Sequence, residues 1–121
     1  MILLVGAGGF IGSVLRYAMS LLLPTRMLGD FPVSTLLVNI VGSFLIGVIF
    51  FLASKGMVSK EMQLFLATGI CGGFTTLSAF SLETMNLYKS GQTGLAALYV
   101  ALSVGLGLLA VFGGLKAAKM L

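Results

Sequence analysis

Charged residues are scarce in this sequence, and histidine and tryptophan are absent. Only 8% of the 121 residues are charged while 59% are apolar, whereas soluble domains carry roughly 25% charged residues. So few charges cannot cover a water-facing surface, which excludes an ordinary soluble domain. With no histidine and three acidic residues, one chain cannot build a histidine-based triad or a paired-carboxylate glycosidase site. We therefore do not expect an enzyme.

Cysteine is scarce as well. The single cysteine, Cys71, has no partner for an internal disulfide and lies in an apolar run, where an isolated thiol usually behaves as a small hydrophobe. No Cys or His spacing typical of a metal site is present. The net charge is +4, but the basic residues are scattered between apolar runs, whereas a nucleic-acid binder would cluster them on one face. We therefore expect these charges at membrane borders and no nucleic-acid partner.

Long apolar runs are what the sequence has in abundance. A helix needs about 20 apolar residues to cross the hydrocarbon core of a bilayer. Four runs are long enough, and they cover residues 2–23, 33–54, 62–88 and 94–115. A cleaved signal peptide is disfavoured for the first run, because no positive start precedes it and Arg16 interrupts it. The sequence predicts an all-α membrane protein with four transmembrane helices in a single domain over 1–121.

The loops between the runs indicate an orientation. Three short loops cover 24–32, 55–61 and 89–93, so an even number of spans puts both termini on one side. That side would carry Lys55, Lys60, Lys116 and Lys119, and the other side Arg26 and Lys89. The positive-inside rule then favours cytoplasmic termini in the cell inner (plasma) membrane. Because the excess is small, a fixed orientation, dual insertion and an oppositely inserted partner all remain open.

The glycine-rich opening at 6–12 predicts helix packing. Gly6, Gly9 and Gly12 recur every third residue and would form a flat face on which another helix packs closely. The opening superficially resembles a dinucleotide-binding fingerprint followed by Asp30, but residue 11 is Ile where that motif needs Gly, and no βαβ unit surrounds it.

Two polar residues lie deep inside the first and second runs. Arg16 would either snorkel toward the Pro24 end or attract anions at a vestibule, since a charge at membrane depth is costly when unpaired. Asn39 would either bond a neighbouring helix or donate to an anion, since its amide carries both donors and an acceptor. Four short helices cannot readily enclose a pathway alone, so we expect an oligomer.

The third run has the most specific pattern. Paired glycines followed by paired β-branched threonines favour a helix break near 72–76. Carbonyls freed at such a break can coordinate a cation, and half-helix N-termini can face an anion. Hydroxyls follow at Thr75, Thr76, Ser78 and Ser81. Glu83 lies either in a functional position or at the membrane interface, and Tyr99 and Ser103 share a helical face that either packs or donates.

Three segments together resemble the CrcB/Fluc family of fluoride channels. They are GAGGFIGSVLRY at 6–17, STLLVNIVGSFLIG at 34–47 and GICGGFTTLSAFSLE at 69–83. With the length and the four-span plan, the resemblance covers essentially the whole chain. It implies a passive fluoride-selective channel that exports cytoplasmic fluoride, built as an antiparallel dimer with pores at the subunit interface.

The resemblance also implies roles for single residues. A structural sodium ion at the dimer centre would be held by the backbone carbonyls of Gly72 and Thr75. The implied fluoride pathway contains Asn39, Phe80, Ser78, Ser81, Thr76, Tyr99, Ser103, Arg16 and Glu83. Within it, Asn39 would donate to fluoride, Arg16 would lie at the vestibule and Glu83 near a pore end.

Two positions depart from the family pattern. Residues 77–80 usually read Phe-Ser-Thr-Phe in this family, and the two phenylalanines present positively polarised ring edges to the anion. Here the residues are Leu77, Ser78, Ala79 and Phe80, so one ring and one hydroxyl are missing. Both a homodimer with slower permeation and one subunit of a two-chain pair fit this change.

Two other functions compete with that of a channel. A proton-coupled exporter of the small multidrug resistance type also has four spans, but it needs a carboxylate in the first span, which holds Arg16 and no acid. A non-transporting membrane scaffold would explain the glycines but not the hydroxyl-rich, broken third run.

Overall fold

The computed structural model describes residues 1–23 and 31–120. These residues form the helices α1 (Ile2–Leu22), α2 (Val33–Ser54), α3 (Lys60–Gln63), η1 (Leu64–Cys71), α4 (Gly72–Phe74), α5 (Leu77–Lys89) and α6 (Thr93–Lys119). Most of the loop expected at 24–32, with Arg26 and Asp30, lies outside the described residues.

Four of the helical segments are long and apolar enough to cross a membrane: Ile2–Leu22, Val33–Ser54, Lys60–Lys89 and Thr93–Lys119. The third of these spans is assembled from α3, η1, α4 and α5. Its part η1 is a π-helix, a wider turn than the sequence pattern predicts. The all-helical, four-span, multi-pass architecture expected from the sequence is confirmed.

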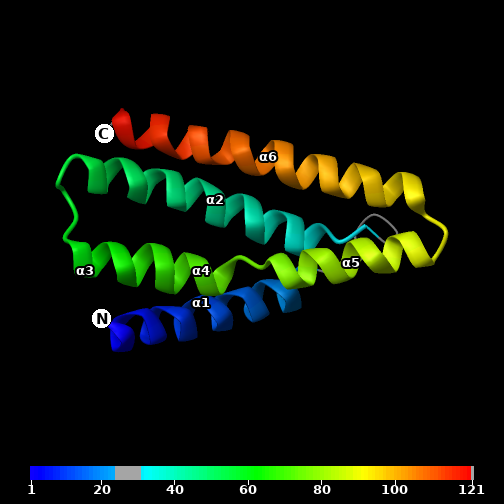
Figure 1. The fold of residues 1–121 in the computed structure, drawn as a ribbon, viewed down its shortest axis with the longest axis horizontal. Coiled ribbons are helices and arrows are strands. Elements are labelled where there is room, and N and C mark those ends of the chain that lie inside the picture. Colours follow the sequence, from blue (N-terminus) through cyan, green and yellow to red (C-terminus); the bar gives the residue numbers. More distant parts are fainter. Residues whose placement is uncertain (24–30, 121) are drawn as a thin grey trace.

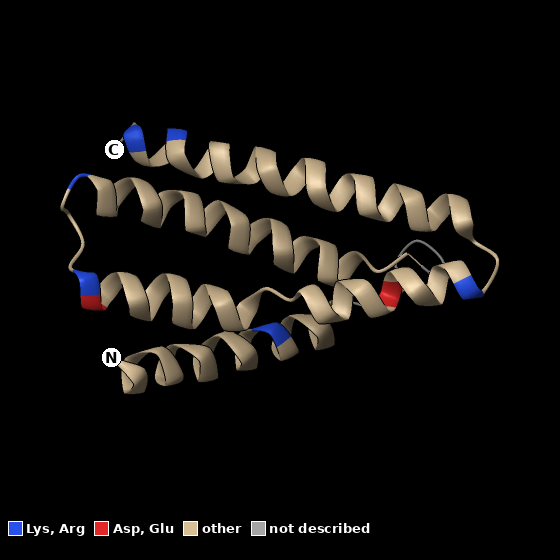
Figure 2. Ribbon diagram, in the orientation of Figure 1, with Lys and Arg blue, Asp and Glu red and all other residues tan. Residues whose placement is uncertain are grey.

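α2, the third span and α6 lie side by side, and α1 covers only the first part of the third span (Figure 1). α1 packs against η1 and α4, α2 packs against α6, and α5 packs against the first half of α6. Both termini lie at the same end of the molecule, beside the turn that follows α2. Most basic positions lie at this end, on α3, on the turn after α2 and on the last turn of α6 (Figure 2).

Glycines let α1 and the third span approach to backbone contact. A Cβ atom added at Gly8 would lie 2.5 Å from the Phe65 carbonyl oxygen, and one added at Gly12 would overlap the Ile70 carbonyl oxygen. Gly47 of α2 and Gly114 of α6 are equally tight against the partner helix. Such small-residue seams are typical of membrane helices, where close packing drives association.

The packing face of α1 differs from the one predicted. A Cβ atom at Gly6 would meet no atom within 4 Å, so Gly6 does not belong to the seam. Gly8 and Gly12 are the positions in contact, because residues four apart share a helix face whereas a strict period of three drifts off it. Gly9 contributes its backbone to the seam, because a Cβ atom added at Gly73 would lie 2.6 Å from the Gly9 carbonyl oxygen.

Candidate functional site

The third span is interrupted at two threonines. Thr75 and Thr76 have extended backbone (φ −82°, ψ 157° and φ −149°, ψ 124°), between the end of α4 at Phe74 and the start of α5 at Leu77. The break therefore lies inside the predicted 72–76, but Gly72 and Gly73 themselves are helical. Threonine hydroxyls stabilise the break, since they offer the backbone alternative hydrogen bonds. The Thr75 hydroxyl donates to the Cys71 carbonyl at 2.8 Å, and the Thr76 Oγ1 accepts from the Ala79 N–H at 3.1 Å as the N-cap of α5.

Asn39 of α2 binds the break from one side. Its Oδ1 accepts from the Thr76 N–H at 2.9 Å, and its Nδ2 donates to the Thr76 carbonyl at 3.2 Å. The interhelical hydrogen bond considered for Asn39 is thus present. Because an amide group carries two N–H donors, one remains for a ligand.

Arg16 of α1 binds the break from the other side. Its Nε donates to the Gly73 carbonyl at 3.2 Å, and the side chain is half-buried. The basic position of α1 lies next to the break (Figure 2). The side chain is therefore tied to the third span.

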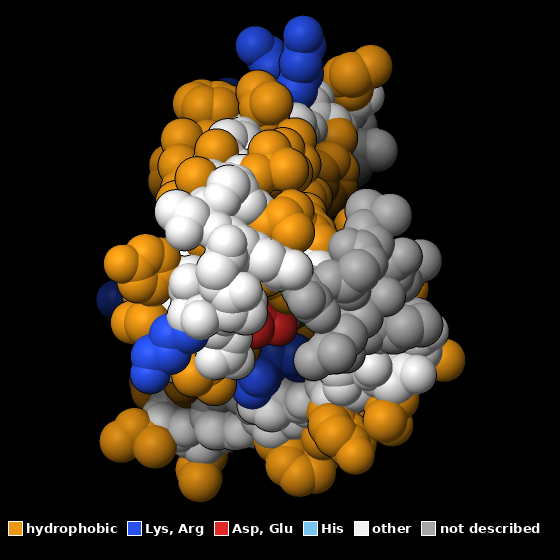
Figure 3. Space-filling model, turned by 90° about the vertical axis from the view of Figure 1, so that its right-hand side faces the viewer, with side chains coloured by type: hydrophobic (Ala, Val, Ile, Leu, Met, Phe, Trp, Pro, Cys, Tyr) orange, Lys and Arg blue, Asp and Glu red, His pale blue; other side chains and the backbone are white. Residues whose placement is uncertain are grey.

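A cavity of about 320 Å³ lies between α1, α2 and α5. Its lining is Ser13, Arg16, Tyr17, Ser20, Ser34, Thr35, Val38, Thr76, Ala79 and Glu83. We call it the charged cavity, because Arg16 and Glu83, the charged residues buried farthest inside the spans, both line it. Arg16 and Glu83 make no ion pair in the described part of the chain; Glu83 accepts instead from the Tyr99 hydroxyl at 3.2 Å. In the end view, an acidic side chain is recessed in a hollow beside basic atoms (Figure 3).

A second, more open hollow of about 300 Å³ lies between α2, the break, the start of α5 and α6. Its lining is Asn39, Ser43, Ile46, Thr75, Thr76, Leu77, Phe80, Ser103 and Val104. We call it the neutral groove, since none of these residues is charged. The Ser103 Oγ is buried and has no hydrogen-bond partner among the described residues.

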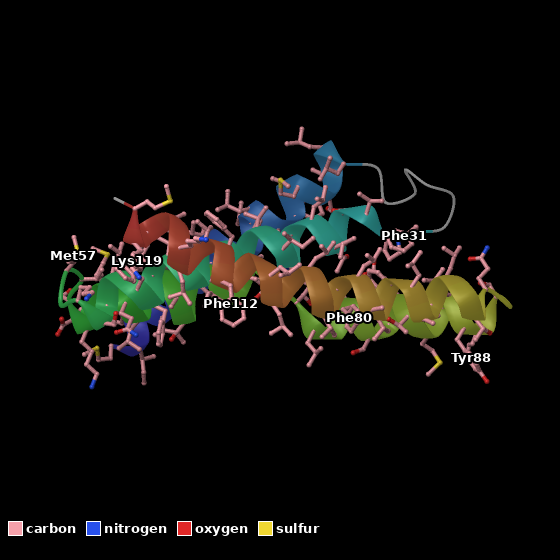
Figure 4. All side chains as sticks on the ribbon, turned by 90° about the horizontal axis from the view of Figure 1, so that it is seen from above. Phe31, Met57, Phe80, Tyr88, Phe112 and Lys119 are labelled. Atoms are coloured by element: carbon pink, nitrogen blue, oxygen red, sulfur yellow. The ribbon has the colours of Figure 1, made fainter. Side chains whose placement is uncertain are left out.

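Aromatic packing holds Phe80 in place at this groove. The Phe80 and Tyr99 ring centroids lie 5.0 Å apart, and Tyr99 is also packed edge-on against Phe31 with centroids 5.5 Å apart. Tyr99 is fully buried in this cluster. Phe31 and Phe80 lie on the α5 side of the molecule, away from the end that carries Met57 and Lys119 (Figure 4).

Thr76 lines both the charged cavity and the neutral groove. Asn39 is bonded to both backbone polar groups of Thr76, so it holds the residue that the two spaces share. The molecule therefore brings an arginine, an amide and hydroxyl groups together around one interruption in the third span.

Several residues proposed from the resemblance lie elsewhere. Ser81 lines a separate, mostly apolar depression between α5 and α6, with Thr84 and Tyr88. Ser78 is exposed, with its hydroxyl 3.3 Å from that of Thr76. Tyr99 lines neither space and reaches the charged cavity through its hydrogen bonds with Glu83 and Thr35, which line that cavity.

Other polar residues at the site were not assigned from the sequence. They are Ser13, Ser20, Ser34 and Thr35 in the charged cavity and Ser43 in the neutral groove. The helical spacing of Ser13, Arg16 and Ser20 was a usable signal, since residues three and four apart share a face. Ser43 follows Asn39 by four residues and gives the same signal on α2.

The carbonyls at the break fit a cation. Among the described residues, no hydrogen bond reaches the Gly72 or Thr75 carbonyl, and no group of three or more His, Cys, Asp or Glu side chains could hold a metal. Carbonyls of an unwound membrane helix coordinate sodium in transporters. Gly72 and Thr75 are thus the candidate donors, and they are the two residues that the resemblance implies.

Comparison with known proteins identifies the family. The family described as "CrcB-like protein, Camphor Resistance (CrcB)" matches residues 3–115. A protein of Rhizobium meliloti named "Fluoride-specific ion channel FluC" is 53% identical over 115 residues, covering 94% of this chain and 92% of the relative. Proteins of the same name from Chlorobaculum tepidum and Thermus thermophilus are 50% identical over 120 residues (98% and 94% covered) and 47% identical over 114 residues (94% and 91% covered). These relatives are named as channels, which agrees with the expectation that the chain is not an enzyme. The chain belongs to the CrcB family.

Proposed function

We propose that this protein is a passive fluoride-selective channel that exports cytoplasmic fluoride. Relatives about half identical over nearly the whole chain are named fluoride-specific ion channels. The observation that carries the proposal is the broken third span, where Thr76, held by Asn39, lines both the charged cavity and the neutral groove.

The residues of the two spaces suggest how an anion would pass. Arg16 would raise the anion concentration in the charged cavity, as a cationic cleft does in general. The free N–H of Asn39, the Ser103 hydroxyl and the Phe80 ring edge would then replace the water shell of fluoride in the neutral groove. Selectivity in narrow pores comes from such replacement at close contact. A negative cell interior drives anions outward, so no energy source is needed.

The proposal includes an antiparallel dimer with its pores between the subunits. The neutral groove is open along one side of a single chain, so a second subunit would supply the missing wall. Large apolar side chains such as Phe112 and Tyr88 are 65% and 62% exposed, and they require cover by lipid or by protein. The second subunit would be a second copy or a paired homologue, and Leu77 is the difference that motivates the homologue.

A structural sodium ion forms part of this proposal. The Gly72 and Thr75 carbonyls would hold it, and two carbonyls from each of two subunits would together approach the oxygen-rich shells of hard cations. The ion would fix the two breaks against each other at the dimer centre. Cytoplasmic termini in the inner (plasma) membrane follow from the lysines that lie at the end shared by both termini.

Fluoride efflux from liposomes tests the proposal directly. The purified chain alone would be reconstituted with internal fluoride or chloride, and valinomycin with potassium would balance the charge. We expect rapid fluoride efflux at the electrode and no chloride efflux. Fluoride efflux would also mean that one type of chain suffices and that Leu77 is tolerated.

Other results of this assay would lead to different conclusions. Efflux restored by a co-reconstituted homologous chain would retain the channel and establish a two-chain pair. No efflux in either preparation would favour the scaffold, and efflux that depends on a proton gradient would favour the small multidrug-type exporter.

A further inference from the structure

The carbonyls at the end of α4 are not equivalent. A helix leaves its last four carbonyls without partners inside the helix. Here the Cys71 carbonyl receives the Thr75 N–H at 2.9 Å and the Thr75 hydroxyl at 2.8 Å, and the Gly73 carbonyl receives Arg16 Nε at 3.2 Å. Within the described residues the Gly72, Phe74 and Thr75 carbonyls receive no hydrogen bond. Protein donors thus bind some of the freed carbonyls, while the neighbouring carbonyls have no protein donor among the described residues.

Gly73, whose carbonyl accepts a hydrogen bond, and Gly72, whose carbonyl accepts none among the described residues, also differ in their surroundings. Gly73 is packed on α1, since a Cβ there would lie 2.6 Å from the Gly9 carbonyl oxygen. Gly72 is exposed, and a Cβ there would meet nothing nearer than the Ala67 carbonyl oxygen at 3.8 Å. Arg16 therefore binds the covered side of the half-helix and leaves its open side for another ligand.

We propose that Arg16 is a positioning residue for the cation at the break, in addition to any attraction it exerts on anions. Through the Nε bond it would hold the last turn of α4 against α1 and fix the peptide units on either side of Gly73. One of these units carries the Gly72 carbonyl, and the same turn leads through Phe74 to Thr75, whose carbonyl follows in the extended break. A charge-assisted bond from a planar guanidinium restricts orientation more than a rotating ammonium does. This inference rests on the proposed function, because the cation belongs to that proposal.

The Arg16→Lys variant distinguishes a positioning role of Arg16 from a purely electrostatic one. Arg16→Lys keeps the positive charge but loses the planar Nε donor, while Arg16→Gln loses the charge as well. If Arg16 acted only by attracting anions, Arg16→Lys would bind sodium like the wild type. If it positions the break, both variants would bind sodium more weakly.

The measurement is sodium affinity, read without transport. Thermal unfolding of the purified full-length chain in detergent would be followed while sodium replaces N-methylglucamine, since a ligand that binds the folded state raises the midpoint with concentration. We expect Arg16→Lys and Arg16→Gln to weaken apparent sodium binding roughly tenfold, as loss of a charge-assisted hydrogen bond implies. Lys89→Gln is the matched control, because Lys89 is an exposed cation at the far end of α5, and it should leave sodium binding unchanged.

A backbone substitution keeps the inference testable if the Arg16 variants do not fold. Replacing the amide between Gly73 and Phe74 by an ester weakens the Gly73 carbonyl as an acceptor and leaves every side chain in place. Weaker sodium binding by this ester would support the positioning role. Sodium binding of wild-type strength in Arg16→Lys, or in the ester if the variants are unfolded, would overturn it.

The same assays separate this inference from the proposed function. Wild-type protein that conducts fluoride but has no sodium-dependent stability would overturn the cation and the role of Arg16 while the channel stands. Wild-type protein that binds sodium, loses affinity in Arg16→Lys and conducts nothing would support the positioning role while the channel fails.

Discussion

The charged cavity and the neutral groove share Thr76, the residue that Asn39 binds, yet they differ in chemistry. The charged cavity holds Arg16 and Glu83 among serine and threonine hydroxyls. The neutral groove offers an amide, hydroxyls and the Phe80 ring, with no charged side chain in its lining. One interruption of the third span therefore supports two different environments.

This difference indicates a division of labour. A fixed charge acts over a distance that ionic strength controls, with a Debye length of about 30 Å at 0.01 M and about 3 Å at 1 M salt. A neutral donor acts only at contact, where salt has little influence. The charged cavity should therefore govern how many anions arrive, and the neutral groove should govern which anion passes.

Asn39→Asp should disturb both spaces at once, because Asn39 holds Thr76, which lines both. A carboxylate would lose the donor to the Thr76 carbonyl, face that carbonyl at close range and place a negative charge in the anion path. An unpaired charge inside a span costs about 2.5–3.5 kcal/mol, so fluoride efflux from liposomes should fall about a hundredfold or more.

The matched control for this change is Asn86→Asp. Asn86 is an exposed residue of α5, so the same chemical change there should leave efflux at the wild-type level. Unchanged fluoride efflux in Asn39→Asp would refute the role assigned to Asn39.

Gly12→Ala should disturb one space and spare the other. The added methyl would overlap the Ile70 carbonyl oxygen and lie 2.8 Å from the Phe74 amide nitrogen, so α1 must move away from the third span. Overpacking of this kind costs about 1–3 kcal/mol, which reversible unfolding in detergent would measure. Arg16 lies one turn farther along α1, so the charged cavity would be displaced, whereas the neutral groove is lined by α2, the break, α5 and α6 and by no residue of α1.

Gly6→Ala is the control for the seam. A methyl at Gly6 would meet no atom within 4 Å, and alanine favours helix over glycine by about 1 kcal/mol. Stability should stay the same or rise. Equal losses in both variants would mean that the seam does not depend on the close approach at Gly12.

The architecture can be predicted from the sequence because the sequence signals for it are strong. Apolar runs of membrane length and the change from paired glycines to paired threonines located four spans and a break inside 72–76. The pattern did not identify which residues leave the helix. Gly72 and Gly73 remain helical because backbone contact with α1 and the Arg16 bond support that turn, and such tertiary contacts are invisible in local propensity.

The site was harder to predict than the fold. Ser81 belongs to the hydroxyl-rich segment but lies on another face of α5, since it follows Phe80 by one residue and each residue turns an α-helix by about 100°. The serines of α1 and Thr35 escaped notice because each is ordinary alone and becomes part of a polar cavity only when α1, α2 and α5 are brought together. Partners across helices decide such roles, and a single sequence does not reveal them.

Ser103→Ala tests whether a loss in the neutral groove depends less on salt than a loss in the charged cavity. Its buried Oγ has no partner among the described residues and lines the neutral groove, so its loss removes a contact donor. A net hydrogen bond is worth about 0.5–1.5 kcal/mol, and fluoride efflux should fall roughly threefold to tenfold. The loss should be the same at about 0.01 M and 1 M ionic strength, whereas the loss in Arg16→Gln should shrink as screening rises. A strongly salt-dependent loss in Ser103→Ala would contradict the division between the two spaces.

Leu77→Phe tests the smallest expected effect, the missing ring of the neutral groove. Leu77 is 75% exposed and lines this groove near Phe80, so a ring there would add a second positively polarised edge for fluoride. Aromatic contacts of this kind are worth about 0.5–1.5 kcal/mol, and we expect fluoride efflux to rise about twofold to fivefold with chloride efflux still absent. Leu82→Phe is the matched control, because Leu82 is 63% exposed on α5 but lines neither the groove nor the charged cavity. A rise in both variants would reflect a general effect of added aromatic surface in the bilayer. No rise in either would mean that Phe80 alone supplies the ring contact the groove needs, and Leu77 would then be no reason to expect a different chain as partner.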